Sequence, residues 1–372
     1  MGTIWLYVDA TVLGDVYFQV CFLIQTFVFL LYMKRITIID IAKALDITPS
    51  TVSRALADNP RVSDLTRKKV HDKALELGYQ PNVVAASLRR GKSDTIGMLV
   101  PQISRHFFSH VISAVEAVLN PAGFNLLICQ SHEKADLEKK ALHVLIKNQV
   151  AGIILSHAME TVDFDEINQV ADRRLPIVQF DRVTKKISGP RIVNDNFSGA
   201  YMAVKHLLRS GYSRIAHLTG SLAVNVYSER FAGYKSAIQE ASLNIDGLVF
   251  EDAITRQAGY EKAFDLLGKG KVDAFFCAGD YSSLGVIQAV HDFGLLVPDD
   301  IGVVGFANEP FSGLITPNLS TVEQNAYDMG YRVASALIRI INGRYLSSVN
   351  IEEVVPVRLL VRESSMPGLI KK

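Results

Sequence analysis

The sequence predicts two folded parts, an all-α head near the N-terminus and a larger α/β body after it. Short helical patterns fill residues 33–80, apolar strands alternate with helical stretches from residue 94 onward, and the charge changes sign between the two regions. With 372 residues, 49% of them hydrophobic, and three cysteines, the chain has room for two or three domains. This composition excludes a disordered protein and a disulfide scaffold.

The net charge of +1 conceals an uneven distribution. Residues 1–32 carry two Asp and no Lys or Arg, residues 33–93 carry 12 basic and 6 acidic residues, and residues 94–372 carry 27 basic and 30 acidic residues. A short, strongly basic segment favours contact with nucleic acid, whereas the mildly acidic remainder is expected to stay away from it.

The first 32 residues form an apolar leader. From Val16 to Met33, 15 of 18 residues are apolar, which is long enough for a membrane span. A cleaved signal peptide fits poorly because the segment before the apolar run carries only acids. We interpret residues 1–32 as upstream sequence translated from a wrongly assigned start, with Met33 as the natural beginning. A membrane anchor and a buried core helix are the alternatives.

The basic head contains three expected helices. Apolar residues recur at helical spacing in residues 38–45 and 49–57, and Thr37 and Thr48 are suited to cap the two segments. A three-residue connection joins them, which is the arrangement of a helix-turn-helix. A third helix is expected over residues 66–77.

The second helix of such a motif presents its N-terminal side chains to the major groove. Arg54 is suited to a bidentate pair with guanine, which discriminates between bases by about 1–3 kcal/mol. The hydroxyl groups of Thr48, Ser50 and Ser53 suit phosphate oxygens. A protein-binding module with a solvated basic face is the alternative.

Residues 81–93 are expected to form a hinge helix and linker. Asn82 can cap a helix over residues 83–90, which is too short to be stable alone. Arg89 belongs to a basic cluster that suits phosphates, and Leu88 is placed to wedge into a minor-groove step. An ordinary linker with one leucine is the alternative.

From residue 94 onward, the alternation of strands and helices is typical of parallel βαβ units. The expected strands cover residues 95–100, 124–128, 152–155, 177–180, 214–218, 274–277 and 301–305. The expected helices cover residues 108–119, 134–148, 197–210, 228–241, 257–267 and 282–293. About 280 residues exceed what one such sheet usually holds, so two lobes are expected.

Ligands of such sheets bind at the carboxyl ends of the strands, here in a cleft between the lobes. Loops that follow the strands supply the candidate ligand-binding residues Phe107, Phe108, Asn225, Arg230, Asp280, Asn308 and Gln324. The two phenylalanines suit stacking on a sugar or base, with a core role as the alternative. Asp280 is equally suited to be a helix N-cap.

No catalytic constellation emerges from the sequence. A nucleophile elbow, a GxGxxG motif and a CxxC motif are all absent. His106 and His110 have the spacing of a metal-binding pair, but no third ligand nearby completes a set. We therefore expect no enzymatic activity, no cofactor and no metal site.

The sequence resembles the lactose-repressor (LacI/GalR) family. The matching motifs are Ile38–Ala42, Thr51–Leu56, Thr66–Val70, Leu77–Asn82 and Ala85–Leu88, and the similarity continues to the C-terminus. The resemblance implies a cytoplasmic homodimer that binds pseudo-palindromic operator DNA. It also implies that Pro49, Ser50 and Arg54 read bases and that Leu88 intercalates. Because Pro49 has no donor, base readout is expected to rest on the other two residues.

The resemblance also implies two similar Rossmann-like lobes of the periplasmic-binding-protein type, which bind the effector and form the dimer. Lobe 1 would comprise about residues 94–194 and 322–349, and lobe 2 about residues 195–321 and 350–372. Effector binding would change lobe closure and thereby operator affinity. The prediction is a ligand-responsive repressor, and a membrane-anchored solute-binding receptor is the alternative.

One departure from the family concerns the effector. Many sugar-binding members carry an acid after a Gly-Tyr or Gly-Phe pair, where this chain has Ala307 and then Asn308. A sugar or sugar derivative is the expected effector. An acidic or phosphorylated ligand on Arg230 is the alternative.

Overall fold

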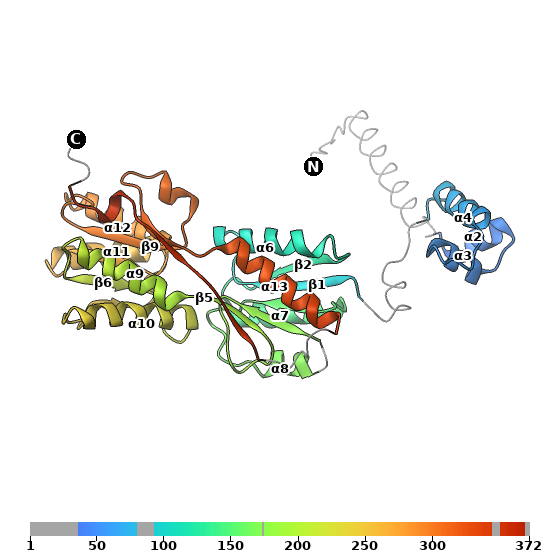
Figure 1. Ribbon diagram of the computed structural model, residues 1–372, viewed down its shortest axis with the longest axis horizontal. Helices are drawn as coiled ribbons and strands as arrows, with labels where there is room; N and C mark the ends of the chain where they lie inside the picture. The colour runs from blue at the N-terminus through green and yellow to red at the C-terminus, as the bar shows by residue number, and fades with distance from the viewer. Residues whose placement is uncertain (1–35, 80–92, 173–174, 344–349, 369–372) are drawn as a thin grey trace, which may run out of the picture. The chain divides into compact units, whose positions relative to one another are not determined.

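The computed structural model describes residues 36–79, 93–172, 175–343 and 350–368. The chain divides into two compact units at Gly91, the head and the body (Figure 1). The leader and the predicted DNA contacts Asn82, Leu88 and Arg89 lie outside the described residues. None of the helices in the described ranges combines the length and the apolar character needed to cross a membrane.

In the described part of the head, three helices enclose a small apolar core. They are α2 (Ile38–Leu45), α3 (Pro49–Leu56) and α4 (Asp64–Glu76). Ile41 and Val52 are fully buried where the helices meet. The arrangement of α2 and α3 is the predicted helix-turn-helix.

Side-chain caps determine where these helices begin. The Thr48 hydroxyl accepts a hydrogen bond from the Thr51 N–H at 3.2 Å, as predicted for the start of α3. The Ser63 hydroxyl accepts from the Thr66 N–H at 3.3 Å. Because Ser63 caps α4, this helix begins at Asp64, two residues before the predicted start.

The described part of the body contains one six-stranded sheet in each lobe. The sheet of lobe 1 has the order β11-β5-β4-β3-β1-β2, and that of lobe 2 the order β12-β10-β9-β8-β6-β7. The lobe 1 strands are β1 (Thr95–Val100), β2 (Asn125–Gln130), β3 (Ile153–Leu155), β4 (Ile177–Phe180), β5 (Arg191–Asn194) and β11 (Glu352–Val355). The lobe 2 strands are β6 (Ile215–Leu218), β7 (Val249–Phe250), β8 (Ala274–Cys277), β9 (Gly302–Phe306), β10 (Ser320–Glu323) and β12 (Arg358–Leu360). The two orders correspond strand by strand.

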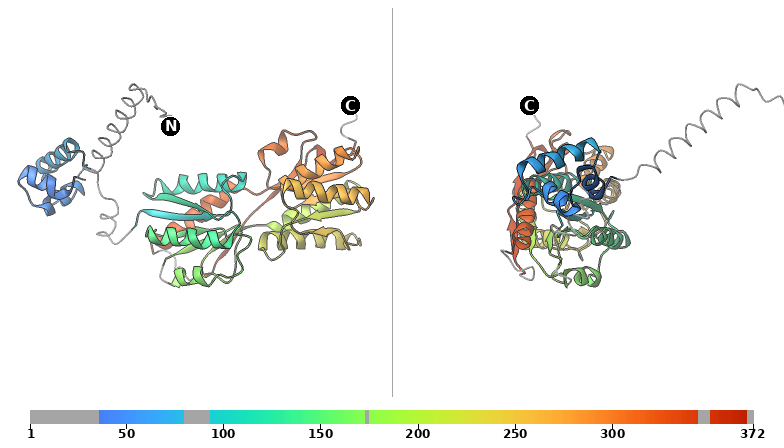
Figure 2. Two further views of the ribbon diagram at one scale, coloured as in Figure 1. Left: turned by 180° about the vertical axis from the view of Figure 1, so that it is seen from behind. Right: turned by 90° about the vertical axis from the view of Figure 1, so that its right-hand side faces the viewer.

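Helices cover both faces of each sheet (Figures 1 and 2). In lobe 1, α6 (His106–Leu119) and α13 (Ala326–Ile341) pack on one face, and α7 (Ala135–Lys147) and α8 (Asp165–Asp172) on the other. In lobe 2, α9 (Asn196–Arg209) and α10 (Asn225–Glu240) face α11 (Arg256–Gly268) and α12 (Asp280–Asp292) across the sheet. Because both faces are buried, the central strands are continuous apolar runs.

Within the described residues, the chain crosses between the lobes three times, after β5, after β10 and after β11. The first two crossings lie close to the predicted boundaries. The boundary predicted at residue 350 is wrong, because β11 pairs in parallel with β5 of lobe 1. An ion pair of 3.1 Å between Arg191 and Glu352 supports this pairing, so the crossing lies between Val355 and Arg358.

Candidate functional site

The exposed end of α3 is the candidate DNA-reading surface. Val52 and Ala55 turn inward, so Thr48, Pro49, Ser50 and Arg54 are exposed and Ser53 is half-buried. The first turn of α3 carries no acidic residue, so nothing there opposes the partial positive charge of the helix N-terminus. The Thr48 hydroxyl caps the helix and also lies 2.8 Å from the Ser50 hydroxyl.

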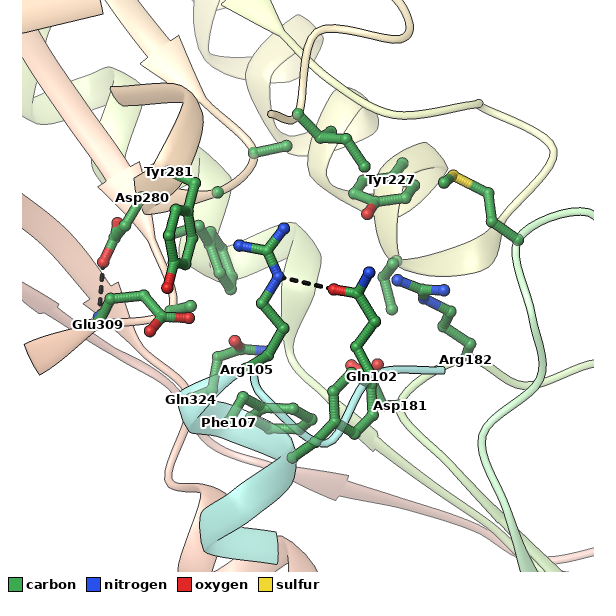
Figure 3. Close-up of a pocket in the computed structure, with 18 of the residues that line it drawn as sticks. Gln102, Arg105, Phe107, Asp181, Arg182, Tyr227, Asp280, Tyr281, Glu309 and Gln324 are labelled. Atoms are coloured by element: carbon green, nitrogen blue, oxygen red, sulfur yellow. Dashed lines mark hydrogen bonds between the residues drawn. The ribbon is translucent and has the colours of Figure 1, made fainter. Parts of the chain in front are cut away.

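The body has a pocket of about 240 Å³ between its lobes, at the carboxyl ends of the parallel strands (Figure 3). Lobe 1 lines it with the polar side chains of Gln102, Arg105, Glu133, Asp181 and Arg182, and lobe 2 with those of Tyr227, Arg230, Thr255, Asp280, Tyr281 and Glu309. Of the predicted ligand residues, Phe107, Phe108, Arg230, Asp280 and Gln324 line the pocket. Both phenylalanines also belong to the apolar core of lobe 1.

Arg230 is buried at the pocket wall. Its Nε donates to Asn196 Oδ1 at 2.9 Å, its Nη1 donates to the Ala278 carbonyl at 2.7 Å, and its guanidinium lies 3.7 Å from the centroid of the Phe306 ring. Burial lowers the pKa of Arg230, but a guanidinium remains charged. Its hydrogen-bond partners are neutral oxygens, and the Asp181 and Glu229 carboxyl groups lie near enough to oppose the lowering of its pKa.

Arg182 is neutralised by a neighbour. It follows β4 and forms an ion pair with Glu133, which follows β2. The Glu133 carboxylate also accepts a hydrogen bond from the Met159 N–H at 3.1 Å. The pair therefore joins three loops of lobe 1 beside the pocket.

Asp181 points into the pocket and is only 6% exposed (Figure 3). No described residue donates a hydrogen bond to its carboxylate. Burial raises the pKa of Asp181, and the charges of Arg182 and Arg230 oppose that shift. A buried carboxyl group without a partner is a ready acceptor or donor for a ligand hydroxyl.

Asp280, in contrast, is fully occupied by its own lobe. Its carboxylate accepts from the Glu309 N–H and the Ser312 hydroxyl, both at 2.8 Å, and from the Thr321 hydroxyl at 2.6 Å. It is the first residue of α12, and Gly279 is the N-cap. A Cβ on Gly305 would lie 2.1 Å from Asp280 Oδ1, so only glycine fits at that point of β9.

Two predicted ligand residues do not line the pocket. Asn225 connects the lobes, since its Oδ1 accepts from the Val183 N–H and its Nδ2 donates to the Asp181 carbonyl, both at 3.0 Å. The amide of Asn308 donates to Glu323 at 2.7 Å and accepts from Arg362 at 2.8 Å. At Ala307 and Asn308 the backbone has φ of 113° and 49°, so the chain leaves the extended direction of β9 at this point.

Several pocket residues were not predicted, among them Arg105, Glu133, Asp181 and Arg182. Glu133 and the Asp181-Arg182 pair lie in loops that follow β2 and β4, so the rule that found Arg230 also applies to them. No group of three or more potential metal ligands occurs in the part of the chain that the structure describes.

Comparison with known proteins gives two family matches. Residues 37–82 match the lacI family of bacterial regulatory proteins, and residues 204–365 match a periplasmic binding protein-like domain. The HTH-type transcriptional regulator RegA of Clostridium saccharobutylicum is 34% identical over 333 residues, covering 88% of this chain and 98% of that protein. The ribose operon repressor of Halalkalibacterium halodurans is 33% identical over 333 residues, covering 89% and 98%.

Solved structures give the same picture. The lac repressor dimer bound to operator and the anti-inducer ONPF has a TM-score of 0.79 at 25% identity, covering 90% of this chain and 100% of that chain. A complex of the transcriptional regulator CelR with cellobiose has a TM-score of 0.67 at 26% identity, covering 89% and 100%.

Proposed function

We propose that this chain, which belongs to the LacI family of bacterial regulatory proteins, is a homodimeric repressor controlled by a small effector. The observation that carries the proposal is the combination of an exposed reading helix in the head with a charged pocket between the lobes of the body. The protein would act in the cytoplasm, where its operator is.

For the head, we propose that Arg54 reads a guanine and that Ser50 and Ser53 contact phosphates or base edges. The exposure of Arg54 and Ser50 on one side of α3 supports these roles. The roles of Asn82, Leu88 and Arg89 in the hinge remain predictions from the sequence.

For the body, we propose that the effector binds in the pocket and contacts both lobes. A ligand with partners on both sides stabilises the closed arrangement, and this gives the differential affinity that allosteric control requires. Operator DNA must then change effector affinity by the same factor. The ribose repressor and the CelR complex with cellobiose support an effector of the sugar class.

An apolar groove in lobe 2 supports the homodimer. It has a volume of about 430 Å³ and is lined by Leu284, Ile287, Leu295 and Leu296. Leu296 is 62% exposed, and Leu314 beside the groove is 81% exposed. Apolar patches of this kind mark protein interfaces, and a second copy of the chain is the occupant we propose.

The test is to select bound DNA from a random pool with the full-length protein and then to measure affinities by fluorescence anisotropy. Arg54→Ala should lose about 1–3 kcal/mol of discrimination at one base pair of each half-site. Lys69→Ala, on the exposed side of α4, is the matched control and should weaken binding to every sequence alike. If Arg54→Ala also weakens all sequences equally, Arg54 does not read a base.

A further inference from the structure

The pocket contains two arginines, one from each lobe, that form no ion pair with any described residue. Arg105 belongs to lobe 1 and Arg230 to lobe 2. The third pocket arginine, Arg182, provides the contrast, because Glu133 neutralises it. Two guanidinium groups without an ion-paired partner among the described residues suit a ligand that carries a negative charge, an inference that rests on the proposed function.

Arg105 extends across the opening between the lobes (Figure 3). Its Nε donates to Gln102 Oε1 at 3.0 Å, and its guanidinium carbon lies 4.1 Å from the centroid of the Tyr281 ring, on the other lobe. The ring fixes the plane of the guanidinium while leaving its two terminal nitrogens without a protein acceptor among the described residues. A planar guanidinium held in this way is preorganised for a planar two-oxygen anion.

Of the carboxyl groups that line the pocket, only Glu133 forms an ion pair with an arginine among the described residues, and its partner is Arg182. Asp280 is occupied by three donors of its own lobe. Burial raises the pKa of both Asp181 and Glu309, and the charges of neighbouring arginines oppose the shift in both. The oxygens of these carboxyl groups can accept hydrogen bonds from the hydroxyl groups of a polyol.

We propose that the effector is a small sugar acid whose carboxylate binds Arg105 and whose hydroxyl groups bind Asp181, with Arg230 as a second donor from the opposite lobe. The size of the pocket, about 240 Å³, is at the small end for ligand sites and suits a single sugar unit. A carboxylate fits better than a phosphate ester, because its planar pair of oxygens matches the planar Arg105 guanidinium, whereas a phosphate group is tetrahedral.

This proposal also gives Arg105 a role in the change of operator affinity that the effector causes. In the described conformation its guanidinium rests on Tyr281, so it already connects lobe 1 to lobe 2. A carboxylate bound by Arg105 and also within reach of lobe 2 donors adds to that connection. The acid should therefore change operator affinity more than the corresponding neutral sugar does.

The test uses isothermal titration of the full-length protein at pH 7 with matched probes: glucose, gluconate, glucuronate and glucose 6-phosphate, and the same set from galactose. Arg105→Met keeps an apolar stem on Tyr281 and removes the charge. Arg209→Met, on the exposed side of α9, removes a charge far from the pocket lining and is the control. Thermal unfolding of each variant checks that it is folded.

We expect at least one acid to bind about 10- to 100-fold more tightly than its neutral sugar, the ratio typical of one charge-assisted pair. Arg105→Met should bring that ratio close to one without weakening the neutral sugar, and Arg209→Met should leave it unchanged. The proposal is wrong if no acid binds, if the phosphate ester binds best, or if Arg105→Met weakens acid and sugar equally. Operator binding that responds to a neutral sugar at least as strongly as to its acid would overturn this inference and leave the proposed function intact.

Discussion

Each lobe anchors a loop beside the ligand pocket with one buried carboxylate, but the two lobes place that carboxylate differently. In lobe 2, Asp280 holds the loop after β9 and itself lines the pocket. In lobe 1, Glu138 on α7 holds the loop after β3 by accepting from the Ala158 N–H and, at 2.8 Å, from the Thr161 hydroxyl, and it lies outside the pocket lining.

The two lobes therefore differ in how firmly their charged pocket residues are held by hydrogen bonds. In lobe 2 the charged pocket residues Asp280 and Arg230 are held by several hydrogen bonds within the body. In lobe 1 the anchor is remote, so Arg105 and Asp181 remain available to a ligand. On the proposed function, lobe 2 would supply a fixed wall of the pocket, and lobe 1 would supply the groups that respond to the effector.

The largest effect should come from removing the lobe 2 anchor. Asp280→Ala leaves three buried donors without an acceptor, each costing about 1–3 kcal/mol, and should lower the free energy of unfolding by about 3–5 kcal/mol. Glu138→Ala leaves two donors without an acceptor and should lower the free energy of unfolding by about 2–4 kcal/mol. Urea denaturation followed by circular dichroism measures both.

Effector binding distinguishes the two variants further. Asp280→Ala should lose effector affinity along with stability, because the loop that carries Glu309 loses its anchor. Glu138→Ala should retain most of its effector affinity at temperatures where it is folded. Equal losses in both variants would contradict the separation of roles.

The sequence predicted seven strands, β1 to β4, β6, β8 and β9, but not the described strands β5, β7, β10, β11 and β12. Strands such as β4 are buried on both faces, so they appear as short apolar runs. Strand β11 lies at a sheet edge and begins with Glu352 and Glu353, and β7 has only two residues, so neither produces such a run. Their pairing depends on contacts that are distant in sequence.

The pocket residues likewise divide into those that a local sequence pattern predicts and those that depend on contacts distant in sequence. The rule that ligand-binding residues follow strands predicted both Arg230 and Asn225, and of these two Arg230 lines the pocket. The orientation of the Arg105 side chain depends on Gln102 and on Tyr281 of the other lobe, and no local pattern encodes that. Asn308 was predicted to face the pocket because it follows a strand. The prediction failed because the positive φ of Asn308 could not be read from the sequence.

A buried histidine should make lobe 2 sensitive to acid. His217 on β6 is fully buried, its ring stacks on Phe276 and Tyr234, and its Nδ1 lies 3.0 Å from the Phe276 carbonyl. Burial lowers the pKa of His217 from 6.5 to about 4. Between these values the unfolded chain binds the proton and the folded protein does not, so stability rises with pH across this range.

The shift corresponds to about 3 kcal/mol of stability, present above pH 6.5 and lost as the pH falls to 4. His217→Phe keeps the aromatic stack and should flatten this part of the stability profile, measured by urea denaturation at several pH values. The lobe 1 histidine, His157, also has a pKa lowered by burial, so His157→Phe is the comparison. A profile unchanged in His217→Phe would show that this ring does not control the acid response.

The smallest effect should appear where the lobes meet. Asn225 makes two hydrogen bonds from lobe 2 to the backbone of lobe 1, at Val183 and Asp181. Asn225→Ala removes both, worth about 1–2 kcal/mol together, and should weaken effector binding by about 5- to 30-fold while leaving the unfolding of each lobe nearly unchanged. Titration calorimetry and urea denaturation measure the two quantities.

Asn308→Ala is the matched control, because the same amide group is removed from a residue whose hydrogen bonds stay within lobe 2. It should lower the stability of lobe 2 and leave effector binding almost intact, the reverse of Asn225→Ala. Since effector and operator are linked, Asn225→Ala should also reduce the change in operator affinity that the effector causes. If both variants change effector affinity and stability alike, the amide of Asn225 has no specific role in lobe closure. Contact between the lobes would then depend on the residues that line the pocket.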